Sequence, residues 1–365
     1  MSEWQTFCLK DLGKIVGGAT PSTNNPKNYG NKIAWITPKD LSTLQGRYIK
    51  KGSRSISRLG FKSCSCVLLP KHAILFSSRA PIGYVAIAKK RLCTNQGFKS
   101  IIPNKKIYFE FLYYLLKYHK DNISNIGGGT TFKEVSGATL GLFKVKIPPT
   151  YYEQQKIART LSILDQKIEN NHKINELLHT LAYRIYEYYF KYKPKNAKLE
   201  QIIIENPKSS IMVKNAQKTQ DKYPFFTSGD NILFYPKAII DGRNCFLNTG
   251  GNAGIKFYVG KASYSTDTWC ICANEFSDYL YLLLSSIKTH INQSFFQGTS
   301  LKHLQKNLLK NILIYMPSAH EIKKFNQIIM PLLTLISINT RISKKLEQIR
   351  DFLLPLLLTQ QVKPQ

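Results

Sequence analysis

The sequence is short of acidic residues. Its 365 residues include 22 aspartates and glutamates against 52 lysines and arginines, which gives a net charge of +30. Residues 41–109 contain no acidic residue, although lysines and arginines are spread along the whole stretch. A surface of this kind favours a polyanion, and nucleic acid is the natural partner. On composition alone an alternative stays open, in which the basic charge is a property of the source proteome and lies on a solvated face.

Long apolar runs and paired cysteines are also missing. The most apolar run, residues 328–338, is short and contains a proline, which excludes a membrane span. The first residues lack the pattern of a signal peptide, so we expect a cytoplasmic location and no membrane partner. The seven cysteines include Cys64/Cys66 and Cys270/Cys272 at C-x-C spacing. That spacing supports neither a disulfide framework nor a zinc site.

What the sequence does contain is an internal repeat. GTTFKEV begins at Gly129 and returns as GTSLKHL at Gly298. Three more phrases recur in the same order: WITPKD with FFTSGD, LFSSRAPIG with FLNTGGNAG, and TNQGF with STDTW. Several matches in register indicate a tandem duplication of a unit of roughly 170 to 190 residues.

Each repeat has the same internal order. Short strand-like runs, broken by glycine, proline, asparagine and serine, come first and a helix-like segment follows; the repeat ends in one long helical pattern. This order predicts an α+β fold with two pseudo-symmetric globular domains separated by two long antiparallel helices that form a coiled-coil spacer. The expected bounds are 1–150 for the first domain, 151–193 for the central helix, 194–318 for the second domain and 319–365 for the distal helix.

The two long helices share a heptad seam. The seam begins at Ile157, recurs in the second helix, and carries two polar residues in the middle of each copy. If the helices are antiparallel, Asn171 faces Ser343 and Asn175 faces Asn339, and such buried polar pairs fix the register of coiled coils. The alternative is two ordinary amphipathic helices, each packed on its own domain.

The length of the spacer suggests that it sets the distance between two sites on DNA. A seam of 33 residues is about 50 Å long, and equivalent groove faces of a duplex recur about every 34 Å. Because the two copies have diverged, they should read different half-sites. The sequence therefore predicts an asymmetric two-part site in double-stranded DNA, with unread base pairs between its parts.

Three stretches of the chain resemble a known family. They are KDLGKIVGGATPSTNNPKNYGNKIAWITPKDL, LLPKHAILFSSRAPIGYVAIAKKRLCTNQGF and PPTYYEQQKIARTLSILDQKIENNHKINELL. They resemble the specificity subunit of type I restriction-modification systems, and the resemblance in domain order covers the whole chain. The second half departs from the phrases of the first, since Ser265, Thr266 and Asp267 stand where the first half has TNQ.

The resemblance implies a non-catalytic subunit that reads DNA through two target-recognition domains. It also implies two methyltransferase subunits as partners and restriction subunits in the full complex. S-adenosylmethionine, ATP and Mg would be held by those partners and none by this chain. The sequence agrees, because it contains no N-P-P-[FY] phrase and no G-x-x-x-x-G-K-[ST] phosphate loop. We therefore predict no catalytic residue and no metal ligand.

Two other functions stay open at this stage. The chain could be a stand-alone DNA-binding or scaffolding protein that uses its coiled coil to dimerise. A self-contained methyltransferase or nuclease is the third class, for which no sequence feature speaks.

The repeated phrase is a candidate phosphate contact. A glycine there lets the backbone approach a phosphate, and hydroxyl and ammonium groups can donate to it. The predicted donors are Thr130, Thr131 and Lys133 in the first copy, and Thr299, Ser300 and Lys302 in the second. A helix C-cap followed by a turn would explain the glycine equally well.

Base contacts are predicted in the other repeated phrases. Arg79 is the best single candidate, since an arginine fork can hold guanine O6 and N7. The other candidates in the first repeat are Thr20, Ser22, Lys39, Ser77, Ser78, Asn95 and Gln96. Those in the second repeat are Thr227, Ser228, Asn248, Thr249, Asn252 and Asp267. Residues of these types also close turns, which is the competing interpretation.

Overall fold

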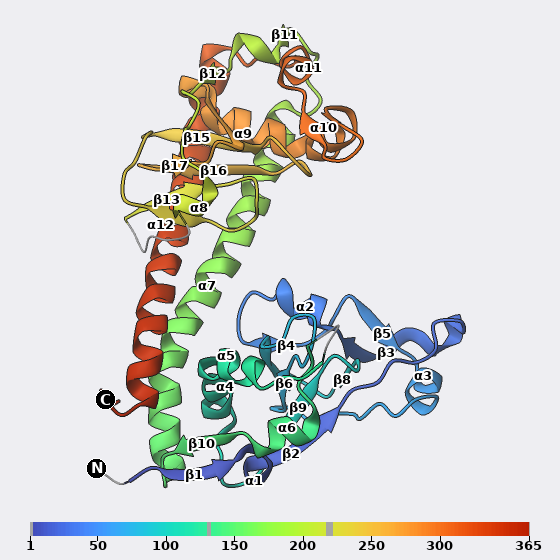
Figure 1. The fold of residues 1–365 in the computed structure, drawn as a ribbon. Helices are drawn as coiled ribbons and strands as arrows, with labels where there is room; N and C mark the ends of the chain where they lie inside the picture. The colour runs from blue at the N-terminus through green and yellow to red at the C-terminus, as the bar shows by residue number, and fades with distance from the viewer. Residues whose placement is uncertain (1–2, 130–132, 217–221, 365) are drawn as a thin grey trace. The chain divides into compact units, whose positions relative to one another are not determined.

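The chain, seen in a computed structural model, forms two compact units. The structure describes residues 3–129, 133–216 and 222–364. The first unit comprises Met1–Glu169 and Lys345–Gln365, and the second comprises Asn170–Lys344. Each unit contains one set of strands together with part of both long helices (Figure 1). The boundary between the units therefore falls within both long helices.

Two long helices follow the apolar strands that end each repeat. They are α7, Tyr151–Phe190, and α12, Ala319–Leu358, drawn green and red in Figure 1. Both begin where the sequence predicts them. No helix in the described part of the chain is long and apolar enough to cross a lipid bilayer.

The first unit is built on a five-stranded sheet with a smaller sheet beside it. The large sheet has the order β2-β9-β6-β7-β4 and the small one β5-β3-β8, while β1 pairs with β10. The strands are β1 Gln5–Cys8, β2 Gly13–Gly17, β3 Tyr29–Ile36, β4 Tyr48–Ile49, β5 Arg54–Ile56, β6 Ile74–Phe76, β7 Val85–Ala88, β8 Cys93–Thr94, β9 Lys99–Pro103 and β10 Lys144–Ile147. The short helices are α1 Leu9–Leu12, η1 Pro26–Asn28, α2 Pro38–Ser42, α3 Arg58–Lys62, α4 Phe109–Tyr118, α5 Lys120–Asn125 and α6 Gly137–Leu142.

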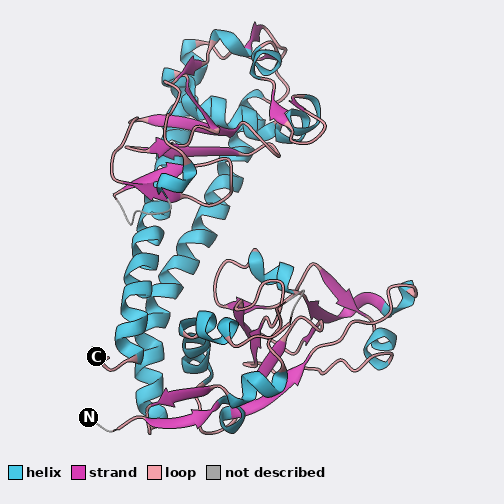
Figure 2. Cartoon of the chain, in the orientation of Figure 1, coloured by secondary structure: helices cyan, strands magenta, loops and turns pink. Residues whose placement is uncertain are grey.

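The second unit repeats this combination of sheets and short helices (Figure 2). Its largest sheet has four strands in place of five. Its sheets have the orders β12-β18-β15-β16 and β14-β13-β17, and β11 pairs with β21. The strands are β11 Ala197–Lys198, β12 Ile204–Glu205, β13 Tyr223–Phe226, β14 Leu233–Tyr235, β15 Arg243–Asn248, β16 Ile255–Val259, β17 Ser263–Tyr264, β18 Thr268–Cys272, β19 Phe296–Gln297, β20 His303–Leu304 and β21 Leu313–Ile314. The short helices are η2 Leu199–Gln201, α8 Val213–Ala216, η3 Asn274–Phe276, α9 Ser277–Ser286, α10 Lys288–Ser294 and α11 Lys306–Lys310.

The duplication is visible in the strand pairing. β3 runs parallel to β8, so that Ile36 lies beside Thr94, and β13 runs parallel to β17, so that Phe226 lies beside Tyr264. The antiparallel order β9-β6-β7 likewise corresponds to β18-β15-β16. This mixed architecture, present twice, confirms the α+β prediction.

In each unit one short helix joins the sheet to the long helices. In the first unit α4 is buried almost all round, and Phe111 and Leu115 share a core with Leu161 of α7 and Leu354 of α12. In the second unit α9 has the same place, and its Tyr279 lies in a core with residues of both long helices. A helix that is apolar on every side needs such covering on every side.

The long helices pair in opposite directions within each unit. In the second unit the Asn171 amide donates to Ser343 Oγ at 3.1 Å, and the Asn339 amide donates to Asn175 Oδ1 at 3.0 Å. Residue numbers rise along α7 as they fall along α12, which makes the pair antiparallel. Both predicted polar contacts are present, and buried pairs of this kind fix register in coiled coils.

Replacing Asn171 with alanine should destabilise the second unit. The Ser343 hydroxyl, only 1% exposed, would lose the amide that donates to it, and a buried polar group left without its partner costs about 1–3 kcal/mol. Asn171→Ala/Ser343→Ala should recover part of that loss. Chemical denaturation of the two single variants and the double variant would measure the coupling, and strictly additive losses would contradict it.

Candidate nucleic-acid interface

Three of the repeated phrases meet at one place in the first unit. After β6 the chain turns at Ser78, whose backbone N–H donates to Gly97 O at 2.8 Å and whose carbonyl accepts from Val135 N at 3.0 Å. The Asn95 N–H in turn donates to Ile36 O at 2.9 Å. Backbone bonds thus hold together the loop after β6, the loop after β8 and the end of the GTTFKEV phrase.

Arg79 lies at the surface of this group of loops. Its side chain is 37% exposed, and its Nη1 lies 3.5 Å from Glu134 Oε2, which belongs to the repeated phrase. Lys99 Nζ lies 3.1 Å from the other oxygen of the same carboxylate. Glu134 therefore limits the positions open to the guanidinium while part of it stays accessible. Base contact by Arg79 remains a prediction.

The TNQG loop and the GGATPS loop are in direct contact. The Thr20 hydroxyl donates to Gln96 Oε1, and Ala19 N donates to Thr94 O at 3.0 Å. A Cβ on Gly18 would lie 2.0 Å from Asn95 O, so only glycine allows this approach. Among the predicted contacts, Thr20, Ser22, Lys39 and Gln96 are exposed, and Asn95 is half-buried.

Ser77 and Ser78 differ from the expected exposed donors. Both are fully buried. The Ser77 hydroxyl donates to Pro81 O at 2.7 Å and accepts from Tyr84 N at 2.8 Å, which closes the loop on itself. The structure gives these serines a loop-forming position in place of the exposed position that base contact requires. The competing interpretation from the sequence, turn closure, describes Ser77 well.

The second unit has an equivalent set of loops. Thr249 N donates to Asp267 O at 3.2 Å, and Leu304 N donates to Thr249 O at 3.0 Å. Ser265 N donates to Phe226 O at 2.9 Å, as Asn95 does to Ile36 in the first unit, although Ser265 lies one residue earlier in its phrase than Asn95 does. The same phrases therefore meet in both units, although their side chains differ.

Several polar side chains of the second unit bond to one another. The Asp267 carbonyl accepts from the hydroxyls of Ser228 and Thr249. The Asn248 amide donates to Asn252 O at 3.1 Å. Thr227 and Asn248 are buried, whereas Asn252 and Asp267 are exposed. We conclude that Thr227 and Asn248 shape the loops, and that the exposed groups around them remain the predicted contacts.

The backbone conformation explains why the repeated phrase begins with glycine in both copies. Gly129 has φ +122° and Gly298 has φ +141°, values that residues with a Cβ rarely adopt. A Cβ on Gly298 would also lie 2.4 Å from Leu301 O. Lys133, Thr299, Ser300 and Lys302 are exposed. Thr130 and Thr131 lie outside the described residues, so phosphate contact by this phrase stays a prediction.

Lys256 belongs to the loop group of the second unit but was not predicted from the sequence. Its Nζ donates to Thr227 O at 2.8 Å and to Asn248 Oδ1 at 3.1 Å, and so ties two of the loops together. Burial lowers the pKa of this ammonium to about 8. In the repeat, Lys256 stands where the first unit has Val85. The replacement of an apolar residue by a lysine within a strand was the signal that could have revealed it.

Lys256 should make stability depend on pH in the alkaline range. Its pKa of about 8 in the folded chain lies below the ordinary 10.5, so between these values the unfolded chain binds more protons and folding is favoured as pH rises. Relative to Lys256→Met, the natural protein should gain about 1–2 kcal/mol between pH 7 and pH 10. Denaturation curves of both proteins at four pH values would measure this difference. Lys261→Met, at an exposed site of the same unit, is the control, and curves for Lys256→Met that stay parallel to the natural protein would refute the expectation.

Comparisons with known proteins agree with this arrangement. The sequence model of the family described as "Type I restriction modification DNA specificity domain" matches residues 1–180 and 195–348. The chain is 33% identical to the type I restriction enzyme MjaIX specificity subunit of Methanocaldococcus jannaschii, in an alignment that covers 97% of this chain and 92% of that protein. It is 30% identical to the HindI specificity subunit of Haemophilus influenzae, over 50% of this chain and 40% of that one.

A solved structure shows the same fold. The S subunit of a type I restriction-modification system from M. genitalium superposes with a TM-score of 0.64 at 18% identity, over 97% of this chain and 96% of that one. The family model matches twice, once on each repeat, and a relative at 33% identity aligns with 97% of the chain. Together these matches show the family. The chain belongs to the specificity subunits of type I restriction-modification systems, a non-catalytic family with DNA-recognition domains.

Proposed function

We propose that the chain reads an asymmetric two-part site in double-stranded DNA, with one half-site for each unit. The observation that carries the proposal is the pair of equivalent loop groups. The backbone N–H of Ser78 and that of Thr249 each donate to the TNQGF or STDTW phrase, and each carbonyl accepts from the phrase that begins at Gly129 or Gly298. One loop group presents Arg79 and Gln96, however, and the other presents Asn252 and Asp267. The same frame with different donors and acceptors fits two readers of different sequences.

The charge of the chain supports DNA as the partner. The net charge is +30, and neutralising phosphates releases counterions, so affinity should fall steeply as salt rises. The Lys133 and Lys302 side chains, exposed beside the loop groups, are suited to phosphate contact. Such contacts position a protein on the duplex, while the base contacts supply the specificity.

We also propose that each unit binds one methyltransferase subunit through its part of the long helices. In the second unit Leu177 of α7 is 71% exposed, with Ile174 and Leu181 exposed on the same face. In the first unit Phe352 of α12 is 68% exposed, near the exposed Ile349. Apolar side chains grouped on a helix face fit a protein partner. Restriction subunits would join this complex, and S-adenosylmethionine, ATP and Mg would be bound by the partners, all in the cytoplasm.

Mapping methylated adenines would test the function. The chain would be produced together with the methyltransferase subunit of its own system, and single-molecule sequencing would locate methylated adenines with the gene present and deleted. We expect one asymmetric motif of two parts separated by unread base pairs, lost on deletion. Methylation that is unchanged by deletion, or equal binding to all DNA sequences, would refute the proposal.

A further inference from the structure

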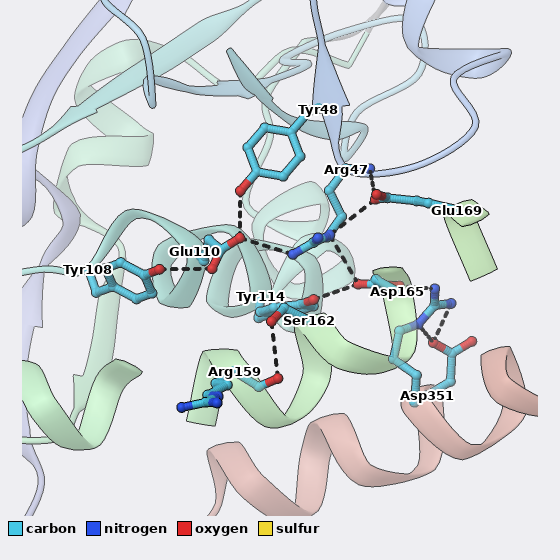
Figure 3. Close-up of polar contacts among 11 residues, drawn as sticks. Arg47, Tyr48, Tyr108, Glu110, Tyr114, Arg159, Ser162, Asp165, Glu169 and Asp351 are labelled. Atoms are coloured by element: carbon cyan, nitrogen blue, oxygen red, sulfur yellow. Dashed lines mark hydrogen bonds and ion pairs between the residues drawn. The ribbon is translucent and has the colours of Figure 1, made fainter. Parts of the chain in front are cut away.

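A buried ionic cluster in the first unit connects the recognition domain to both long helices. Its charged members come from α4, α7, α12 and the segment just before β4, which are far apart in the sequence (Figure 3). We call this cluster the ionic joint, and define it as Arg47, Glu110, Asp165, Glu169 and Arg350. No residue of the joint belongs to the loop groups described above.

Arg47 is the centre of the ionic joint. Its side chain is 3% exposed, with Nη1 3.0 Å from Glu110 Oε1 on α4 and Nε 3.1 Å from Glu169 Oε1 on α7. Its Nε also lies 3.9 Å from Asp165 Oδ2. The backbone N–H of Arg47 donates to Glu169 at 2.9 Å. One residue of the recognition domain thus holds a short helix of that domain and the long helix α7.

Asp165 extends the joint to α12. Its side chain is 6% exposed, and its Oδ1 lies 2.7 Å from Arg350 Nη1. Its other oxygen accepts from the Tyr114 hydroxyl of α4 at 2.5 Å. Burial, followed by the Asp165 charge, raises the pKa of Tyr114, so this hydroxyl keeps the proton that it donates. The carboxylate therefore binds α4, α12 and Arg47 at one point.

Both oxygens of the Glu110 carboxylate accept further hydrogen bonds. Glu110 accepts from the Tyr48 hydroxyl at 2.5 Å and from the Tyr108 hydroxyl at 2.9 Å. Gly46, with φ +111°, brings the backbone against α7, and a Cβ there would lie 2.9 Å from Glu169 Cγ. The glycine before Arg47 is thus needed for the approach, and the joint is built by backbone and side chains together.

A cluster of this kind specifies an arrangement more than it stabilises one. Removing charges from water costs nearly as much as their attraction returns, so a well-packed apolar contact would hold the domain at least as firmly. An apolar contact can slide or rotate at small cost, whereas a buried arginine must keep its carboxylates in hydrogen-bond geometry. We expect the joint to determine how the domain is oriented on α7 and α12.

In the second unit a different arginine links the short helix to a long helix. Asp278 of α9 stands where the first repeat has Glu110, and it is 1% exposed. Arg243, the first residue of β15, forms an ion pair with it. The same guanidinium donates to Thr334 Oγ1 at 3.0 Å and to Met330 O at 3.3 Å, both on α12. An acid of the short helix, an arginine and a long helix are therefore linked in both units.

We propose that the ionic joint, and the Arg243–Asp278 pair in the second unit, are positioning groups that make recognition depend on the separation of the two half-sites. This inference rests on the proposed two-part site. Each recognition domain is held in one orientation on helices that continue into the other unit. Half-sites at the wrong separation or rotation would then not be read together, even when every base is correct.

The test uses the complete complex with its methyltransferase subunits. Its substrates are DNAs with the correct half-sites and a spacer that is natural, one base pair shorter or one base pair longer. The variants are Glu169→Gln, which leaves the Arg47–Glu110 pair in place, Arg47→Met and Arg47→Lys. We expect the preference for the natural spacer to fall about 3- to 10-fold in Arg47→Met. It should fall less in Glu169→Gln and be partly restored in Arg47→Lys, while base preference within each half-site stays unchanged.

Two controls separate orientation from folding and from the proposed function. Arg184→Met removes a surface arginine, 75% exposed, whose ion pair with Glu187 lies within α7, and it should not change spacer preference. Thermal unfolding shows which variants fold. If Arg47→Met does not fold, Glu169→Gln provides the test of spacer preference. Unchanged spacer preference in the folded variants would overturn the inference. A natural complex that methylates no two-part motif would instead overturn the proposed function.

Discussion

Arg79→Ala should lower the affinity of the complex for its own DNA site by about 10- to 100-fold, since one bidentate arginine–guanine contact contributes about 1–3 kcal/mol. The guanidinium is 37% exposed and lies 3.5 Å from Glu134, so it is both accessible and oriented before DNA binds. The loss should be confined to one base pair of the first half-site. At that position the variant should no longer distinguish the natural base pair from the others.

Binding measured on a set of DNAs, each with one base pair changed, would check this result at several salt concentrations. Arg58→Ala, which removes the same charge from an exposed place on α3, is the matched control and should weaken binding to all sequences slightly. If Arg79→Ala instead weakens binding equally on all of them, with a shallower salt dependence, Arg79 contacts phosphate and not a base.

Asp165→Asn should destabilise the first unit by about 3–5 kcal/mol, the usual cost of removing one partner from a buried ion pair. The carboxylate, 6% exposed, lies 2.7 Å from Arg350 and 3.9 Å from Arg47. A neutral amide would leave both buried guanidinium groups with less compensating charge. It would also place a donor where the Tyr114 hydroxyl now finds an acceptor.

Differential scanning calorimetry would detect this change as a fall of about 10 °C in the transition of the first unit. Hydrogen exchange assigns that transition to residues of the unit. Asp351→Asn is the control, because the Asp351 side chain is 60% exposed and its pair with Arg350 should contribute less than about 1 kcal/mol. Equal effects of the two substitutions would show that burial of Asp165 is not what matters.

The repeat and the long helices could be read from the sequence because both leave periodic signals. The WITPKD and FFTSGD phrases begin on equivalent strands, β3 and β13. Each of these strands runs parallel to the short strand that leads into the TNQGF or STDTW phrase. The polar residues of the heptad seam meet as their spacing predicts, Asn171 with Ser343 in particular. These features depend on neighbours at fixed intervals along the chain.

The polar interior could not be read in this way. The heptad pattern assigns Leu164 to the seam, yet Asp165 beside it is the more deeply buried residue. Its partners, Arg47 and Arg350, lie far away in sequence at no regular interval. Ser77 was predicted as a base contact, with turn closure as the alternative, and its hydroxyl bonds inside its own loop. Contacts of this kind are decided by tertiary packing, which no local pattern encodes.

The ionic joint takes its residues from both the recognition domain and the long helices, and this has a practical consequence for protein engineering. A chimera that grafts residues 1–150 onto the long helices of a relative would carry Arg47 and Glu110 but leave Asp165 and Glu169 behind. The transplanted arginine would then be buried without two of the three acids that pair with it. Donor and acceptor chains should therefore be joined beyond Glu169, so that the graft brings its own acids with it.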